Sequence, residues 1–322
     1  MNVKVEMEAV GGVDRLRVVE CPVQAPGETE LRVRHQGIGV NFIDIYLRTG
    51  LYPLPLPGVL GVEGAGVVEA VGAAVEGVGV GDRIAYAGIP GGYAATRLLP
   101  AWRAVRLPEA VESETAAASF LRGLTIHMLL MRTFRVARGD TLLVHAAAGG
   151  LGSSLTRWAK RLGCTVIGTA GSPEKAALAR AAGADHVIVG RDADLVGEVQ
   201  GLTGGRGVDH AVDGVGGAML GKTLACVRRF GTIASMGQAA GAIPALSVED
   251  LGPVRSLTLA RPSVMAYAAE PDTYRAATAA VIEAIGEGVL PRPKHRYRLS
   301  EAAAAQHALE SGETTGSLVL VP

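Results

Sequence analysis

The chain has 322 residues, of which 48% are hydrophobic, and this length suggests about two domains. Its 31 lysines and arginines balance 31 aspartates and glutamates, so the formal net charge is zero. Nucleic-acid and anionic membrane surfaces select for a basic excess, which this chain lacks. No segment reaches the roughly 18 uncharged apolar residues of a membrane span. We therefore expect a cytoplasmic protein that binds neither nucleic acid nor membranes.

The cysteine pattern does not indicate a structural metal site. Cys21, Cys164 and Cys226 lie far apart, and none belongs to a CxxC pair. Structural zinc sites need closely spaced thiolates or imidazoles. We therefore expect no bound metal.

The chain begins with a glycine-rich, β-like region that extends to about residue 110. Leu31 and Val33 alternate with Arg32 and Arg34, as in a strand with one buried face. Turn-forming glycine and proline recur throughout this region. We expect a β-rich domain here.

Near Pro108 the β-like pattern ends. Ser113 followed by Glu114 favours the start of a long helix, capped by Ser113, that reaches about Phe134. Regular β–α alternation follows. The expected strands cover 141–146, 165–170, 186–189, 208–213, 232–236 and 256–260. This alternation predicts an α/β fold with a doubly wound parallel sheet. Helices at 272–286 and 300–311 and a strand at 317–321 come last, and we expect them to return to the first domain.

A buried strand from Thr141 leads into a turn of small residues that opens a helix over 153–162. On the GxGxxG pattern, Ala147, Gly149 and Gly152 occupy the three glycine positions, and the first departs from the pattern. Such a turn lets the backbone approach a pyrophosphate, and the helix N-terminus offers it free amides. The sequence therefore predicts a dinucleotide site, with contacts from Ala148, Gly149, Gly150, Leu151 and Gly152.

The end of the second strand bears on which nicotinamide cofactor is used. NAD-dependent proteins have a carboxylate there for the ribose hydroxyl, and the segment 167–173 has none. It offers instead the hydroxyl of Ser172 and the ammonium of Lys175, and Arg191 follows the third strand. These groups suit a 2′-phosphate, so we predict NADPH.

Several motifs together resemble the medium-chain dehydrogenase/reductase superfamily, and within it the NADPH:quinone oxidoreductases that include zeta-crystallin. They are VNFID at 40–44, RTGLYP at 48–53, GVEGAG at 61–66, GLT at 123–125, AAAGGLG at 146–152 and TGS at 315–317. The resemblance implies a GroES-like catalytic domain at 1–118 and 262–322. A Rossmann domain at 119–261 would be inserted between them.

The resemblance also implies a reaction without zinc. Zinc-dependent relatives have a ligand cysteine near position 41 and a histidine just before the glutamate of the 61–66 motif, whereas this chain has Asn41 and Val62. Neither side chain supplies thiolate or imidazole to a metal. The expected function is transfer of reducing equivalents from NADPH to a quinone. An NADPH-dependent enoyl or alkenal reductase, or a non-catalytic NADPH-binding protein, remains an alternative.

By the same resemblance, the site residues fall into two groups. Asn41, Asp44, Tyr46 and Tyr52 would line the substrate side, while Thr125, Met236, Gly237, Gln238 and Arg261 would surround the nicotinamide. Gly190 and Gly312 stand where relatives often have tyrosine and arginine, which weakens the expected selectivity for NADPH. The resemblance further suggests a homodimer joined near the strand 256–260.

Overall fold

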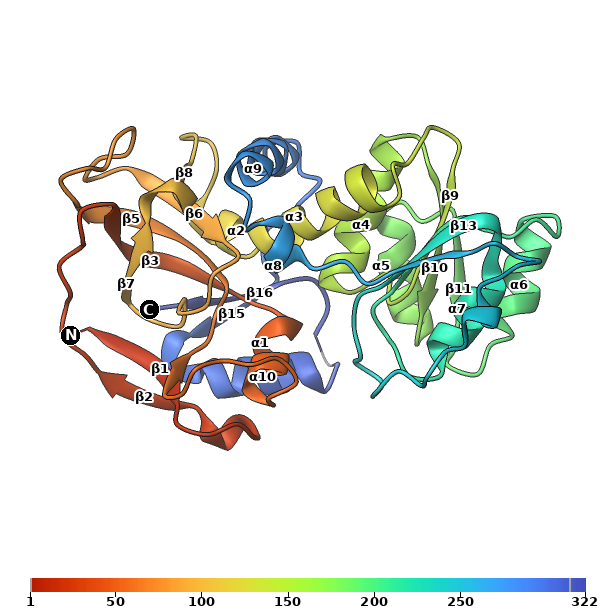
Figure 1. Cartoon of the computed structure of the whole chain (residues 1–322), viewed down its shortest axis with the longest axis horizontal. Coiled ribbons are helices and arrows are strands. Elements are labelled where there is room, and N and C mark those ends of the chain that lie inside the picture. Colours follow the sequence, from red (N-terminus) through yellow and green to blue (C-terminus); the bar gives the residue numbers. More distant parts are fainter. Residues whose placement is uncertain (1, 313) are drawn as a thin grey trace. The chain divides into compact units, whose positions relative to one another are not determined.

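The computed structural model describes residues 2–312 and 314–322, and the chain forms two compact units. The first comprises Met1–Leu124 and Val264–Pro322, and the second comprises Thr125–Ser263. In Figure 1 the first unit contains both the red and the blue ends of the ribbon, so both ends of the chain build it. In the part of the chain that is described, no helix combines the length and the apolar character needed to cross a bilayer.

The first unit consists mainly of two β-sheets. A three-stranded sheet has the order β2-β1-β4, and a larger sheet has the order β15-β16-β3-β5-β6-β8, with β7 also paired to β3. The strands are β1 (Val3–Met7), β2 (Arg17–Glu20), β3 (Glu30–Val40), β4 (Gly58–Val59), β5 (Glu63–Val71), β6 (Arg83–Ala87), β7 (Thr96–Pro100), β8 (Val105–Arg106), β15 (His295–Arg298) and β16 (Leu318–Val321). Because β16 pairs with β3, the last strand of the chain joins the sheet that the first hundred residues build.

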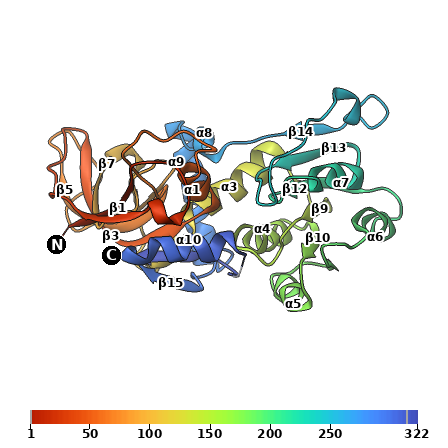
Figure 2. The same cartoon turned by 90° about the horizontal axis from the view of Figure 1, so that it is seen from below.

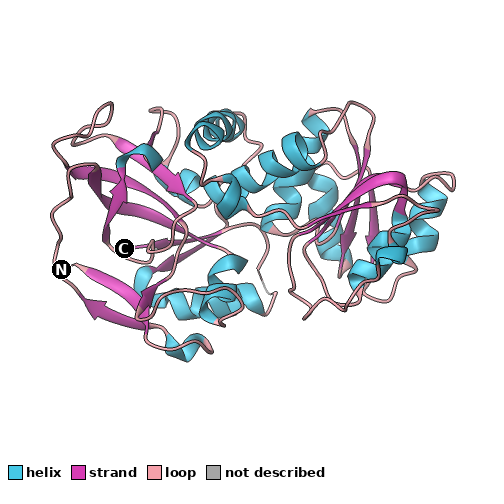
Figure 3. Ribbon diagram, in the orientation of Figure 1, coloured by secondary structure: helices cyan, strands magenta, loops and turns pink. Residues whose placement is uncertain are grey.

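The second unit is the doubly wound parallel sheet predicted from the sequence. Its order is β11-β10-β9-β12-β13-β14. The strands are β9 (Thr141–Val144), β10 (Thr165–Ala170), β11 (His186–Val189), β12 (Val208–Asp213), β13 (Val227–Ser235) and β14 (Thr258–Ala260). Figure 3 shows these strands flanked by helices, and Figure 2 shows α4 and α7 on opposite sides of the sheet. The chain order reverses between β9 and β12, so the carboxyl ends of these two strands flank the switch point.

The helices of both units vary in length from four to sixteen residues. They are α1 (Phe42–Arg48), α2 (Ser113–Ala117), α3 (Phe120–His127), α4 (Gly150–Arg161), α5 (Pro173–Ala181), α6 (Leu195–Leu202), α7 (Met219–Cys226), α8 (Val264–Tyr267), α9 (Pro271–Gly286) and α10 (Ala302–Glu310). A helix of π type continues α3 over Met128–Thr133.

The prediction of one continuous helix from Ser113 to Phe134 was wrong. The chain leaves α2 after Ala117 and begins α3 at Phe120. At this break the Leu121 amide donates to the Glu63 carboxylate at 2.7 Å, so a side chain of β5 takes a donor that a helix would use internally. Ser113 is not the cap, since Glu112 holds that position and the Ser113 hydroxyl donates to Gln36.

Strand β13 begins at Val227, five residues before the predicted start at 232. Val227 pairs with Val208, and the register shifts before His210 pairs with Thr232. The intervening residues include Phe230, whose φ of 60° is left-handed. The irregular register therefore hid the first half of this strand from a search for alternating or continuous apolar residues.

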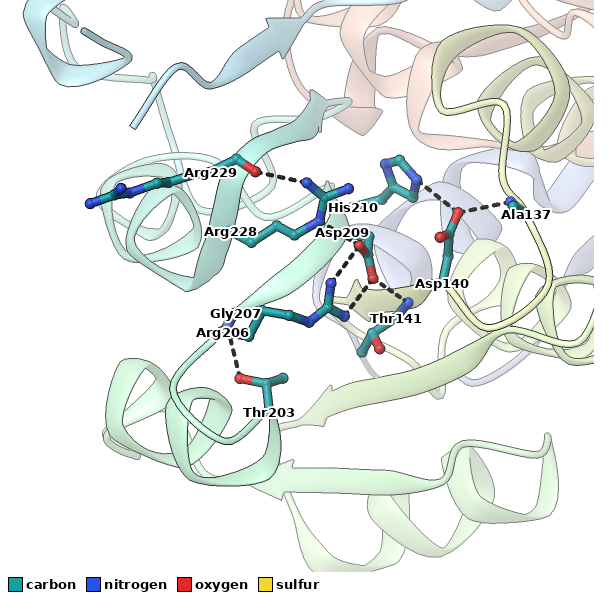
Figure 4. Close-up of polar contacts among 10 residues, drawn as sticks. All are labelled: Ala137, Asp140, Thr141, Thr203, Arg206, Gly207, Asp209, His210, Arg228 and Arg229. Atoms are coloured by element: carbon teal, nitrogen blue, oxygen red, sulfur yellow. Dashed lines mark hydrogen bonds and ion pairs between the residues drawn. The ribbon is translucent and has the colours of Figure 1, made fainter. Parts of the chain in front are cut away.

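The amino ends of the central strands are joined by a polar cluster around Asp209 (Figure 4). Asp209 is 4% exposed and accepts a hydrogen bond from each Nη atom of Arg206, both at 2.8 Å. It also accepts from Arg228 Nε and from the Thr141 amide. These partners hold the pKa of Asp209 well below its usual range, against the effect of burial. One carboxylate thus ties β9, β12 and β13 together.

Candidate active site and dinucleotide site

In the first unit, Asn41 marks the point where β3 ends and α1 begins. Its backbone has extended angles, with φ −135° and ψ 160°, and it caps the helix. The backbone N–H of Asn41 donates to Asp44 Oδ2 at 2.9 Å. Asp44 also accepts from the Tyr93 hydroxyl at 3.2 Å, and Gln306 donates to that hydroxyl. This chain of hydrogen bonds anchors the first turn of α1.

Asp44 does not line the substrate side as the sequence suggested, because its side chain is completely buried. Burial raises the pKa of Asp44 to about 7, with a further contribution from the charge of Glu63, while the bond from the Asn41 amide opposes the rise. The carboxyl group therefore supports Asn41 from beneath the helix. It has no surface with which to touch a substrate.

Glu63, at the start of β5, is a buried carboxylate that the sequence analysis did not include among the site residues. Its Oε1 accepts from Asn41 Nδ2 at 2.7 Å, and its Oε2 accepts from the Leu121 amide at 2.7 Å. Burial raises the pKa of Glu63 to about 7, and these two hydrogen bonds oppose the rise. A carboxylate flanked by Val62 and Gly64, at the buried start of β5, was the signal that could have revealed it.

Tyr46 and Tyr52 lie together on the surface of the same unit. Their rings meet edge to face, with centroids 5.7 Å apart, and Phe42 packs against Tyr46 at 6.2 Å. Both tyrosines and Asn41 are partly exposed. The structure thus brings three of the four predicted substrate-side residues into one local region around α1.

In the second unit, the glycine-rich turn connects β9 to α4. The helix begins at Gly150, three residues earlier than predicted, and Gly149 occupies the cap position. A Cβ atom on Gly152 would lie 2.4 Å from the Ala146 carbonyl oxygen, so this position requires glycine. The first turn of α4 therefore contains Gly150, Leu151 and Gly152, whose amides are the free donors of a helix N-terminus.

The departure at Ala147, in the first glycine position, has a local compensation. Ala147 is fully buried, and Gly168 of β10 lies opposite it. A Cβ on Gly168 would lie only 2.7 Å from the Ala147 Cβ. The methyl group missing from one residue thus makes room for the methyl group of the other.

His145 holds this turn against two neighbouring elements. Its Nε2 lies 2.8 Å from the Thr223 hydroxyl oxygen, and its Nδ1 lies 3.1 Å from the Thr169 hydroxyl oxygen. The Thr223 hydroxyl donates to the Met219 carbonyl, so it accepts from Nε2, which carries the proton. Burial lowers the pKa of His145. The neutral ring of His145 therefore holds the start of the turn in place. The next residue, Ala146, has a left-handed φ of 49°.

Of the residues predicted to receive a 2′-phosphate, Ser172 and Lys175 follow β10. Ser172 caps α5, and its hydroxyl oxygen accepts from the Lys175 amide at 3.3 Å. Arg191 is exposed and follows β11, whose end is joined to that of β10 by a bond from the Gly190 amide to Ala170. A hydrogen bond with Ser172 also lowers the pKa of Glu174. This exposed carboxylate precedes Lys175 in the chain and was not among the predicted site residues.

The remaining predicted cofactor residues of the sheet follow β13 and β14. Met236, Gly237 and Gln238 come directly after β13, and the Met236 amide donates to the Asp213 carbonyl at 2.7 Å. Arg261 follows β14 and donates to the Ser235 hydroxyl at 3.1 Å.

These segments, the glycine-rich turn and Ser172 all follow carboxyl ends of parallel strands, so they share one edge of the sheet. Thr125 lies in α3, which is not part of that edge, and it is buried.

Comparisons with known proteins agree with this arrangement of two units. Residues 27–109 match the alcohol dehydrogenase GroES-like domain, and residues 150–283 match the zinc-binding dehydrogenase domain. The chain is 40% identical to a quinone oxidoreductase from Salmonella typhimurium over the full length of both proteins. It is 39% identical to a 2-haloacrylate reductase from a Burkholderia species, covering 97% of this chain and 96% of the relative.

A crystal structure of Escherichia coli quinone oxidoreductase complexed with NADPH superposes on this chain with a TM-score of 0.96. The two are 39% identical, and the match covers 99% of this chain and 100% of that structure. Neither Asn41 nor Val62 offers a metal the donors that zinc prefers. Among residues 2–312 and 314–322, no group of three or more histidine, cysteine, aspartate or glutamate side chains could hold a metal ion.

Proposed function

Because this chain belongs to the quinone oxidoreductase family of the medium-chain dehydrogenase/reductase superfamily, we propose that it transfers reducing equivalents from NADPH to a quinone without zinc. The observation that carries the proposal is that one chain has a dinucleotide-binding turn in one unit and, in the other, a polar site where Asn41 and Val62 stand in place of zinc-ligand residues. Bound NADPH supplies the hydride, since cofactors carry the redox chemistry and the protein supplies orientation and electrostatics.

The second unit has the features needed to hold NADPH. A Cβ on Gly149 would meet only one atom, the Ala146 carbonyl oxygen at 3.2 Å, so the space into which it would project is otherwise open to a pyrophosphate. The amides of Gly150 and Leu151 would donate to it. Ser172, Lys175 and Arg191 would receive the 2′-phosphate. Ala148, Thr125, Met236, Gly237, Gln238 and Arg261 are the further residues that we assign to cofactor binding.

The first unit would receive the quinone. Asn41 and the Tyr46 hydroxyl would donate hydrogen bonds to the quinone oxygen as negative charge develops there. Tyr52 would pack beside Tyr46 and help to position the ring. The Asn41 side-chain amide donates to Glu63, and Val62 is fully buried. Both observations support a reaction without zinc at the two positions that hold the metal in zinc-dependent relatives.

A substrate panel tests the proposal directly. The purified protein would be assayed with NADPH and NADH against 1,4-benzoquinone, an α,β-unsaturated ketone, 2-chloroacrylate and a primary alcohol, with and without EDTA. We expect the highest kcat/KM for NADPH with benzoquinone and no effect of EDTA. Faster reduction of a carbon–carbon double bond would assign the enoyl-reductase alternative. NADPH binding without turnover of any acceptor would assign the non-catalytic one.

We also propose that the protein is a cytoplasmic homodimer joined along β14. This strand is an edge of the parallel sheet. Around it lie three strongly exposed apolar side chains, with Phe230 at 75%, Val248 at 80% and Val254 at 73% exposure. Exposed apolar residues next to an open strand edge favour pairing with a second copy. Light scattering of wild type and Phe230→Asp tests this, and a monomeric wild type would refute it.

A further inference from the structure

The carboxylate of Glu63 lies between two hydrogen-bond donors that differ in mobility. The Leu121 donor is a backbone amide and cannot turn over. The Asn41 donor is a side-chain amide, which can exchange its NH2 and carbonyl ends by rotating half a turn. Oε2 accepts from the first and Oε1 from the second, each at 2.7 Å.

The backbone around Glu63 is built to hold the carboxylate in this place. Gly39 of β3 faces it, and a Cβ there would lie 2.1 Å from Glu63 Oε1 and 2.5 Å from the Ala117 carbonyl oxygen. Any larger residue at position 39 would displace the carboxylate or the end of α2. Glu63 is itself only 1% exposed. The carboxylate of Glu63 is therefore held in a confined space with little freedom to move.

In this space the ionisation state of Glu63 decides the orientation of the Asn41 amide. A carboxylate only accepts hydrogen bonds, so Asn41 must turn its NH2 inward and its carbonyl oxygen outward. In neutral Glu63, Oε2 still accepts from the fixed Leu121 amide, and the acid proton lies on Oε1. That O–H needs an acceptor, which Asn41 provides by turning its carbonyl inward and its NH2 outward.

We propose that Glu63 is a positioning residue for quinone reduction, and that its neutral form orients the Asn41 NH2 toward the substrate. The inference rests on the proposed function, because it assumes that Asn41 faces the quinone. A quinone oxygen that gains negative charge needs a donor and is repelled by a carbonyl. The outward NH2 is therefore the productive arrangement, and the outward carbonyl is not.

Glu63 titrates in the range where this exchange would affect the rate. Its pKa is raised to about 7 by burial, and the positive charge of Arg122 acts in the opposite direction. Arg122 remains protonated, since burial lowers its pKa only to about 10. Asp44 is the neighbouring carboxyl group that titrates in the same range. Tyr86 and Tyr274 also feel the charge of Glu63, and they stay neutral because burial raises the pKa of each.

The test is the pH profile of kcat/KM for 1,4-benzoquinone at saturating NADPH, which follows the ionisation of the enzyme–NADPH complex that binds the quinone. In the wild type we expect a fall of about tenfold between pH 6 and pH 8.5, with a midpoint near 7. In Glu63→Gln, the side-chain oxygen must face the Leu121 amide, so its NH2 faces Asn41 as the neutral acid does. This variant should lose the alkaline fall and exceed the wild type by about tenfold at pH 8.5.

Two further variants separate Glu63 from its neighbours. Asn41→Ala should be slower at every pH and should also lack the alkaline fall, because Glu63 acts through Asn41. Asp44→Asn should retain the fall, whatever its rate. Persistence of the fall in Glu63→Gln or in Asn41→Ala would overturn the proposal, and so would its loss in Asp44→Asn alone.

A measurement without substrate keeps the inference testable if no quinone is reduced. The side-chain amide resonances of Asn41, assigned with Asn41→Ala, would be followed by NMR across the same pH range. They should shift with a midpoint near pH 7 in the wild type and stay constant in Glu63→Gln. Constant resonances in the wild type would overturn the orientation mechanism, whereas absent quinone turnover would overturn only the proposed function.

Discussion

Replacing Gly152 by alanine is expected to damage both the fold and the cofactor site of the second unit. The added Cβ would lie 2.4 Å from the Ala146 carbonyl oxygen and 2.9 Å from the Ala147 Cα. Both atoms belong to the backbone, so no side chain can move aside. Overpacking of this kind costs about 1–3 kcal/mol. In a unit of roughly 140 residues, each 1 kcal/mol lowers Tm by about 3 °C.

We therefore expect Gly152→Ala to lower the Tm of the second unit by about 3–9 °C and to weaken NADPH binding, because the turn must shift. Circular dichroism measures the first effect and NADPH fluorescence the second. Gly201→Ala in α6 is the matched control, since a Cβ there would meet nothing within 4 Å. Gly149→Ala should lower Tm less than Gly152→Ala, because its Cβ would lie 3.2 Å from the Ala146 carbonyl oxygen, and it should lose NADPH affinity, because the Cβ would crowd the pyrophosphate. Wild-type Tm and affinity in Gly152→Ala would refute this reading of the turn.

Three further predictions concern cofactor choice, stability and catalysis. Lys175→Ala should lower kcat/KM for NADPH about fivefold with little change for NADH. Glu174→Gln should raise the preference for NADPH, because a carboxylate beside Ser172 repels the phosphate. Initial rates with both cofactors check these two expectations. Asp209→Asn should cost about 2 kcal/mol in urea unfolding, less than a fully buried pair, because the Arg206 side chain is 51% exposed. Tyr46→Phe should lower kcat/KM for benzoquinone about tenfold without changing NADPH affinity, and equal kinetics would remove its hydroxyl from the mechanism.

Long-range contacts account for the site features that the sequence did not reveal. Glu63 meets Asn41 across 22 positions and Leu121 across 58. No local pattern announces such a meeting, because the partners come from β5, the cap of α1 and the start of α3. The broken helix has the same origin, since the donor at Leu121 is taken by that carboxylate. The burial of Asp44 was also hidden from the sequence, because it depends on Tyr93, 49 positions away, and on the unit around it.

The sequence by itself determined those features whose causes lie within a few residues of one another. The glycine-rich turn and the strands 165–170, 186–189 and 208–213 all follow from local periodicity and backbone preference. Only the tertiary structure decided which polar side chains lost their water and which partners they found. The ionisation of Glu63 and the direction of the Asn41 amide depend on that burial, because desolvation and hydrogen bonding act through space and not along the chain.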